Sequence, residues 1–127
     1  MIVGVSGANS EIGRAVCEAA SRRKHEVVRL GRDGTSNRFL DVRKPLREDV
    51  AVGLDSVIHL AWDWDGMDGS RRDPNVLGGI ALARACESAG ARPVLLSTYS
   101  AFASDKSAYG SAKSLVERAF TTSGGAS

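Results

Sequence analysis

Tyr109 and Lys113 are the residues in this sequence whose types and spacing are best suited to acid–base chemistry. They lie four positions apart in a segment with helical periodicity, and side chains four apart meet on one face of a helix. A phenol titrates at about pH 10, but a neighbouring ammonium group favours the phenolate. Such a base can move a proton at a substrate hydroxyl. The alternative is a surface tyrosine beside a surface lysine.

Thr98 is a third candidate for the same chemistry. It follows an apolar run that predicts a strand. Its hydroxyl can donate a hydrogen bond to a substrate carbonyl and stabilise the negative charge that develops on the oxygen. The predicted catalytic set is therefore Thr98, Tyr109 and Lys113.

The segment from Gly7 to Gly13 has the layout of a phosphate-binding turn. An apolar run ends at Gly7, and a helical pattern begins at Glu11. The first N–H groups of a helix attract anions, and a glycine turn lets a pyrophosphate approach them. Gly13 would let the helix approach the sheet closely. Ser10 stands where such turns usually carry a glycine, and we expect it to narrow that approach.

Gly31 and Arg32 stand where dinucleotide-binding folds usually carry an acidic residue for the adenosine ribose. Without a carboxylate, a 2′-phosphate meets no repulsion, and a guanidinium binds phosphate through two hydrogen bonds. We therefore predict that NADP(H) is preferred over NAD(H). Arg32 as a solvated turn residue, partly neutralised by Asp33, is the alternative. Asp41 is placed either to reach the adenine edge or to cap the next turn.

Apolar runs alternate with amphipathic segments along the chain, which is typical of a parallel sheet with helices on both faces. The pattern predicts an α/β domain of three layers, with a doubly wound parallel sheet of about five strands. The predicted strands are 2–6, 26–30, 38–40, 56–60 and 94–97, the predicted helices 11–23, 46–52, 74–89 and 108–121, and 122–127 a loose tail.

The composition is that of one globular domain. The chain has 127 residues, of which 43% are hydrophobic and 25% charged, enough for a single core. A net charge of +2 without a basic cluster argues against nucleic acid as a partner. No apolar run approaches the roughly 20 residues of a membrane span. A first strand at the start of the chain leaves no signal peptide, so we expect a cytoplasmic protein.

Several other residues invite a functional interpretation. Cys17 and Cys86 lack metal-ligand spacing and are predicted to be reduced, half-buried thiols, so no metal is expected. His59 ends an apolar strand and is predicted to be a hydrogen-bonded core residue. Trp62 and Trp64 follow that strand at the edge of the sheet where such folds bind ligands. Their rings suit stacking on a substrate, and packing of an exposed loop is the simpler interpretation.

The chain resembles the short-chain dehydrogenase/reductase superfamily, and within it the extended, NAD-dependent epimerase/dehydratase type. The matching segments are 6–13 (SGANSEIG), 41–42 (DV), 57–61 (VIHLA), 75–78 (NVLG), 96–98 (LST) and 109–113 (YGSAK). The resemblance implies a single Rossmann-like NAD(P)-binding domain over residues 1–127. It assigns Tyr109 as the acid/base and Lys113 as the group that favours the phenolate and binds the nicotinamide ribose. Thr98 would orient the substrate oxygen.

The resemblance and the spacing together define an expected cofactor site. Its members come from the glycine turn, from the ends of the strands and from two helices. They are Gly7, Asn9, Ser10, Glu11, Ile12, Gly13, Arg32, Asp41, Val42, Leu60, Ala61, Asn75, Tyr109 and Lys113.

By resemblance, the expected function is that of an NADP(H)-dependent oxidoreductase, epimerase or dehydratase acting on a carbonyl or sugar-like small molecule. The resemblance also implies a sixth strand about where the sequence stops, so we expect a truncated sheet with an exposed edge at 94–97. A non-catalytic NAD(P)-binding module, or a remnant of such an enzyme, is therefore the alternative. The last two helices are expected to form a homodimer contact.

Overall fold

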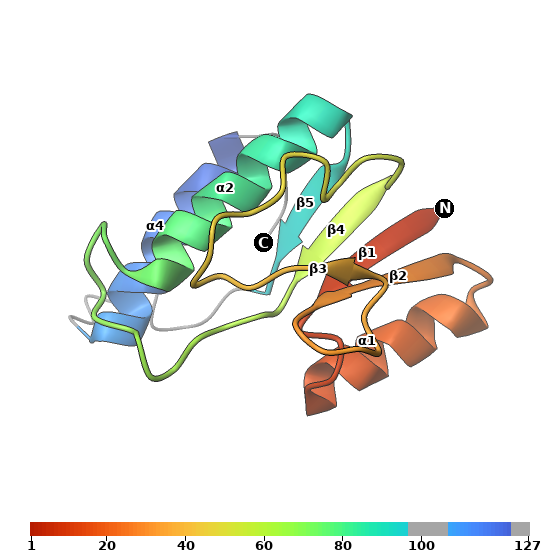
Figure 1. The fold of residues 1–127 in the computed structure, drawn as a ribbon, viewed down its shortest axis with the longest axis horizontal. Helices are drawn as coiled ribbons and strands as arrows, with labels where there is room; N and C mark the ends of the chain where they lie inside the picture. Colours follow the sequence, from red (N-terminus) through yellow and green to blue (C-terminus); the bar gives the residue numbers. More distant parts are fainter. Residues whose placement is uncertain (97–106, 123–127) are drawn as a thin grey trace.

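A parallel β-sheet organises this computed structural model, which describes residues 1–96 and 107–122 (Figure 1). The strands are β1 (Ile2–Ser6), β2 (Glu26–Gly31), β3 (Arg38–Phe39), β4 (Ser56–His59) and β5 (Arg92–Leu95). The helices are α1 (Glu11–Arg22), α2 (Pro74–Ala89) and α4 (Ala108–Thr122). The strand order is β3-β2-β1-β4-β5, with every pairing parallel.

The helices cover both faces of the sheet. Helix α1 lies on one face, and α2 and α4 lie together on the other (Figure 1). From β1 the chain winds outward to β2 and β3, and later to β4 and β5 on the other side. The predicted doubly wound α/β fold is therefore confirmed. The strand order reverses between β1 and β4, and the carboxyl ends of strands at such a point form a crevice where ligands bind.

The largest buried cluster lies between the sheet and the pair α2 and α4. Phe120 and Val116 of α4 and Leu82 of α2 are fully buried there, against Val57 and Leu95 of the sheet. This packing fixes α4, and the predicted acid–base pair that it carries, relative to the ends of β4 and β5. None of the helices within 1–96 and 107–122 is long and apolar enough to cross a membrane.

The predicted helix at 46–52 is wrong, because this segment forms successive turns. The N–H groups of Val50 and Val52 bond to carbonyls three residues earlier. The guanidinium of Arg38 donates to the carbonyls of the same two residues, at 2.9 and 2.8 Å. Those carbonyls thus accept hydrogen bonds from a side chain of β3 rather than from the N–H groups of a helix.

Smaller differences concern element ends and the cysteines. β5 begins at Arg92, two residues before the prediction, and α4 includes Thr122, which was predicted as tail. The predicted tail at 123–127 lies outside the described residues.

Cys17 and Cys86 are free, as predicted, but buried rather than half-buried. Burial raises the pKa of the Cys86 thiol to about 11, so that it stays protonated at neutral pH.

Candidate functional site

An open cavity of about 980 Å³ lies at the carboxyl edge of the sheet, where the strand order reverses. Its walls are the turn after β1, the segment from the end of β2 to Lys44, and the segment that follows β4. The size is within the range of small-molecule and cofactor sites. Eight of the predicted cofactor residues line it, namely Gly7, Asn9, Ser10, Arg32, Asp41, Val42, Leu60 and Ala61.

The turn between β1 and α1 is held by Ser10, which is the N-cap of the helix. Its hydroxyl donates to the carbonyl of Gly7 (2.8 Å) and accepts from the N–H of Gly13 (3.0 Å). Gly7 has φ +68°, and a Cβ on it would lie 2.8 Å from the backbone N of Ala61. The turn is thus packed directly against the segment that follows β4.

Several backbone N–H groups of this turn have no partner among the described residues. The N–H of Ser10 bonds to the carbonyl of Gly7 (3.1 Å), and that of Gly13 bonds to Ser10. The N–H groups of Asn9, Glu11 and Ile12 form no hydrogen bond within the described part of the chain, and all three residues are exposed. A helix N-terminus with open N–H groups stabilises a bound anion.

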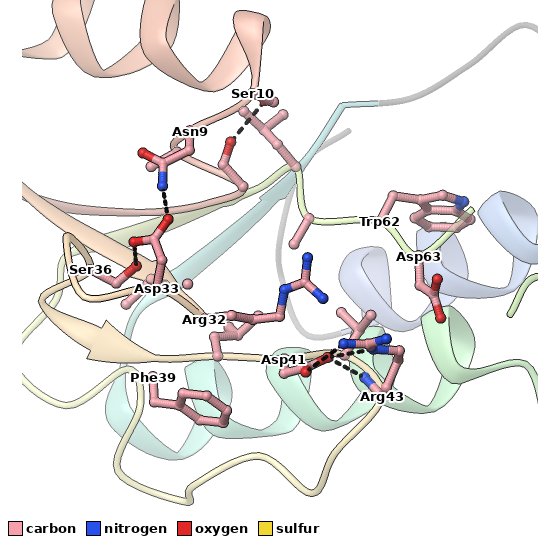
Figure 2. A pocket seen from close by; sticks show the side chains of 18 of the residues that line it. Asn9, Ser10, Arg32, Asp33, Ser36, Phe39, Asp41, Arg43, Trp62 and Asp63 are labelled. Carbon is pink, nitrogen blue, oxygen red and sulfur yellow. Dashed lines mark hydrogen bonds and ion pairs between the residues drawn. The ribbon is translucent and has the colours of Figure 1, made fainter. Parts of the chain in front are cut away.

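Arg32 is the basic side chain nearest the centre of the pocket (Figure 2). Its guanidinium extends into the space between the Ser10 turn and the Asp41–Arg43 pair. It forms no ion pair within the described residues. Asp33, which would neutralise Arg32 in part under the alternative interpretation, accepts hydrogen bonds from Thr35 (2.6 Å) and from Asn9. The bonds from Thr35 are the main reason that the pKa of Asp33 lies below its usual value.

Asp41 lines the same wall, but its carboxylate is used within the protein. It accepts from the backbone N–H of Arg43 (3.0 Å) and from two nitrogens of the Arg43 guanidinium (each 3.2 Å). These bonds lower the pKa of Asp41. The side chain therefore caps the turn, which was one of its two interpretations. Phe39, Arg43 and Lys44 also line the pocket, and the sequence analysis did not select them.

Ser6 and His59 join the ends of β1 and β4 beneath the pocket. The Ser6 hydroxyl accepts from the N–H groups of Leu60 (2.9 Å) and Ala61 (3.1 Å). Its lone pairs are then occupied, so its proton is donated to Nδ1 of His59 (2.6 Å). His59 is thereby hydrogen-bonded as predicted at one nitrogen, whereas Nε2 is buried without a partner among the described residues.

Acidification is expected to destabilise the fold through His59. Burial, and secondarily the charge of Lys113, lowers the pKa of His59 to about 3 from an ordinary 6.5. Between these values the unfolded chain binds one more proton than the folded chain. The free energy of unfolding should thus fall as the pH is lowered from 6.5 to 3, by up to about 1.4 kcal/mol per pH unit from this group.

Urea unfolding across this pH range measures the effect. His59→Gln keeps a hydrogen-bonding side chain but cannot titrate, so its unfolding free energy should depend on pH less steeply. Parallel pH dependences of the two proteins would rule out His59 as the source.

The structure brings Tyr109 and Lys113 together on α4, beside two tryptophans. The Tyr109 ring stacks on Trp64 (centroids 4.9 Å apart) and meets the edge of Trp62 (5.6 Å). The Lys113 Nζ lies 4.5 Å from the Trp62 ring centroid and donates to the carbonyl of Leu96 (3.2 Å). Burial lowers the pKa of Lys113 to about 8.

Some predicted site residues do not line the cavity. Tyr109 and Lys113 lie behind Trp62 and Trp64, which do line it. Asn75 is buried and bonds to both the N–H and the carbonyl of Asp63 (2.7 and 2.8 Å). Glu11, Ile12 and Gly13 belong to the first turn of α1, outside the lining. Thr98 lies outside the described residues.

Comparisons with known proteins agree with this architecture. A family model described as the NAD dependent epimerase/dehydratase family matches residues 3–123. No curated protein matches the chain. Among solved structures, UDP-N-acetylglucosamine 4-epimerase from Bacillus cereus is 20% identical, with a TM-score of 0.77 over 96% of this chain and 48% of that one.

Two further structures are similar. MoeE5, solved with UDP-glucose and NAD, is 24% identical, with a TM-score of 0.77 over 97% of this chain and 49% of its own. The enzyme WbmH of Bordetella bronchiseptica, solved with NAD+, is 18% identical, with a TM-score of 0.75 over 98% and 52%. At these identities the likeness shows the fold alone. The chain spans about half the length of the structures that it matches.

Proposed function

This chain belongs to the NAD-dependent epimerase/dehydratase family, and we propose that it binds a nicotinamide dinucleotide and uses it in hydride transfer to or from a sugar-like small molecule. The observation that carries the proposal is the cavity at the reversal of strand order, bordered by the turn with open N–H groups. The pyrophosphate would lie against the N–H groups of Asn9, Glu11 and Ile12. Gly7, Ser10 and Gly13 would shape that turn.

The rest of the predicted set would divide between the cofactor and the substrate. Val42, Leu60 and Ala61 would form apolar walls for the nucleotide, and Asp41 would border the adenine. When bound, the dinucleotide would supply the acceptor or donor of the hydride. In the oxidation of a substrate C–OH, Tyr109 as the phenolate would take the hydroxyl proton. Lys113 would favour the phenolate, and Thr98 would orient the substrate oxygen.

Titration of the purified chain with NADPH and NADH, followed by a screen of ketones and nucleotide sugars for a change in nicotinamide absorbance, tests the proposal. Binding with turnover supports an enzyme. Binding without turnover supports a cofactor-binding module, an alternative favoured by the position of Lys113 behind Trp62. Failure of both nucleotides to bind would overturn both interpretations.

We also propose that the site prefers NADP(H), because Arg32 is unpaired within the described residues while Asp33 is engaged by Thr35 and Asn9. Arg32→Ala should weaken NADPH binding about 10- to 100-fold and leave NADH binding within about twofold, since charge-assisted hydrogen bonds contribute about 1.5–3 kcal/mol. Calorimetric titration with each nucleotide measures both affinities.

Arg47→Ala is the matched control for Arg32. It removes the same charge from a side chain that pairs with Asp49 (3.0 Å) and does not line this pocket. It should leave both affinities unchanged. Equal losses for NADPH and NADH in Arg32→Ala would contradict the NADP(H) preference.

A homodimer through α2 and α4 is part of the proposal. Leu77 of α2 is a large apolar side chain that is 55% exposed, as expected of a residue in a subunit contact. Analytical ultracentrifugation gives the mass in solution, and Leu77→Glu should shift a dimer toward the monomer.

A further inference from the structure

The ammonium group of Lys113 is buried, and the described residues give it no carboxylate partner. The residue is only 6% exposed, and no acidic side chain within 1–96 and 107–122 forms an ion pair with it. Its hydrogen bond goes to the carbonyl of Leu96, just after β5. Among the described residues, the titratable groups that interact with it are Tyr109 on its own helix and His59 at the end of β4. His59 is neutral near pH 7, since its pKa is about 3.

The ammonium group also contacts the ring of Trp62. The Nζ lies 4.5 Å from that ring's centroid, compared with 5.9 Å from the centroid of Tyr109. A cation within about 6 Å of an indole face is attracted by the ring quadrupole, most strongly when water is excluded. The burial of Lys113 meets this condition.

Trp62 is held in position by the chain around it. Its Nε1 donates to the sulfur of Met67 (3.3 Å). The next residue, Asp63, is bonded at both its N–H and its carbonyl by the buried side chain of Asn75. Asn75 in turn donates to the carboxylate of Asp73, the N-cap of α2. The indole is thus fixed by α2 against a side chain of α4.

We propose that Trp62 is a positioning residue whose indole face stabilises the charged form of Lys113 and holds it beside Tyr109. The importance of Lys113 rests on the proposed function, but the interaction itself does not. In the proposed site, the Trp62 ring stabilises the ammonium group of Lys113, as a carboxylate partner would. Unlike a carboxylate, it adds no negative charge that would repel the phosphates of a dinucleotide.

Fluorination of Trp62 tests this proposal, because it weakens the quadrupole of the indole and hardly changes its size. The chain has two tryptophans, so Trp64→Phe leaves Trp62 alone to be replaced biosynthetically by mono-, di- and trifluorinated tryptophan. The proton affinity of Lys113 is read by ¹⁵N NMR of lysine-labelled protein, with the signal assigned through Lys113→Arg. It should fall with each fluorine, by roughly tenfold over the series.

The reciprocal protein, Trp62→Phe with fluorinated Trp64, is the matched control. Trp64 stacks on Tyr109, and the described residues show no contact between its ring and Lys113. Proton affinity should then be independent of fluorination. A flat response in the first series, or equal slopes in both, would overturn the proposal. No nucleotide is present, so failure of cofactor binding would leave this result unaffected.

Discussion

Tyr109→Phe is expected to lower kcat by about 10²- to 10⁴-fold, the usual contribution of a positioned acid–base group. The substitution removes only the hydroxyl, and the phenyl ring can still stack on Trp64 and meet the edge of Trp62. Stability and dinucleotide affinity should therefore change little. Once a substrate is found, initial rates measured by nicotinamide absorbance give the effect on kcat.

Lys113→Met provides the second half of this test. It removes the ammonium group and keeps an unbranched apolar stem beneath Trp62. If Lys113 favours the phenolate, its loss should lower kcat and shift the pH–rate profile to higher pH. Turnover that survives in Tyr109→Phe would show that another group performs the proton transfer. If the unmodified chain binds the dinucleotide but converts no substrate, the cofactor-binding module is favoured instead.

Gly13→Ala is expected to weaken dinucleotide binding by more than about 100-fold and to lower the free energy of unfolding by about 1–3 kcal/mol. An added Cβ would lie 2.0 Å from the carbonyl oxygen of Gly7 and 2.8 Å from the Cα of Ala8. These are backbone atoms, so the turn itself must move. Movement of the turn would disturb the open N–H groups beside it. Calorimetric titration and urea unfolding measure the two effects.

Gly34→Ala is the matched control for this change. A Cβ on Gly34 meets nothing within 4 Å, although the residue lies in the neighbouring loop after β2. It should bind nucleotide and unfold like the wild type. Wild-type affinity in Gly13→Ala would show that the pyrophosphate does not depend on this turn.

Much of the fold could be predicted, because local signals mark the element ends. Ser10 caps α1, Pro74 opens α2, and Gly90 closes α2 in the left-handed conformation. β5 was misplaced by two residues because proline has no N–H for a strand ladder. Pro93 nevertheless pairs with Val57, which is possible since β5 lies at an edge of the sheet formed by the described residues.

The site was less predictable, because its contacts either join segments that are distant in the sequence or depend on side-chain directions within irregular segments. Periodicity places Tyr109 and Lys113 on one helix face, but only tertiary packing brings Trp62 against them. The bond from Arg43 to Asp41 spans two residues in an irregular segment, where no pattern indicates which way a side chain turns. The two hydrogen bonds between the Asn75 side chain and the Asp63 backbone likewise depend on how α2 packs against the sheet.

Both tryptophans of the chain line the pocket at the carboxyl edge of the sheet, so their fluorescence can report what binds there. Indole emission overlaps the absorption band of reduced nicotinamide, so a bound dinucleotide would accept excitation energy from these two rings. No other indole contributes background light. Occupancy of the pocket can therefore be followed in the unmodified chain, and the Trp62→Phe and Trp64→Phe proteins resolve the signal ring by ring.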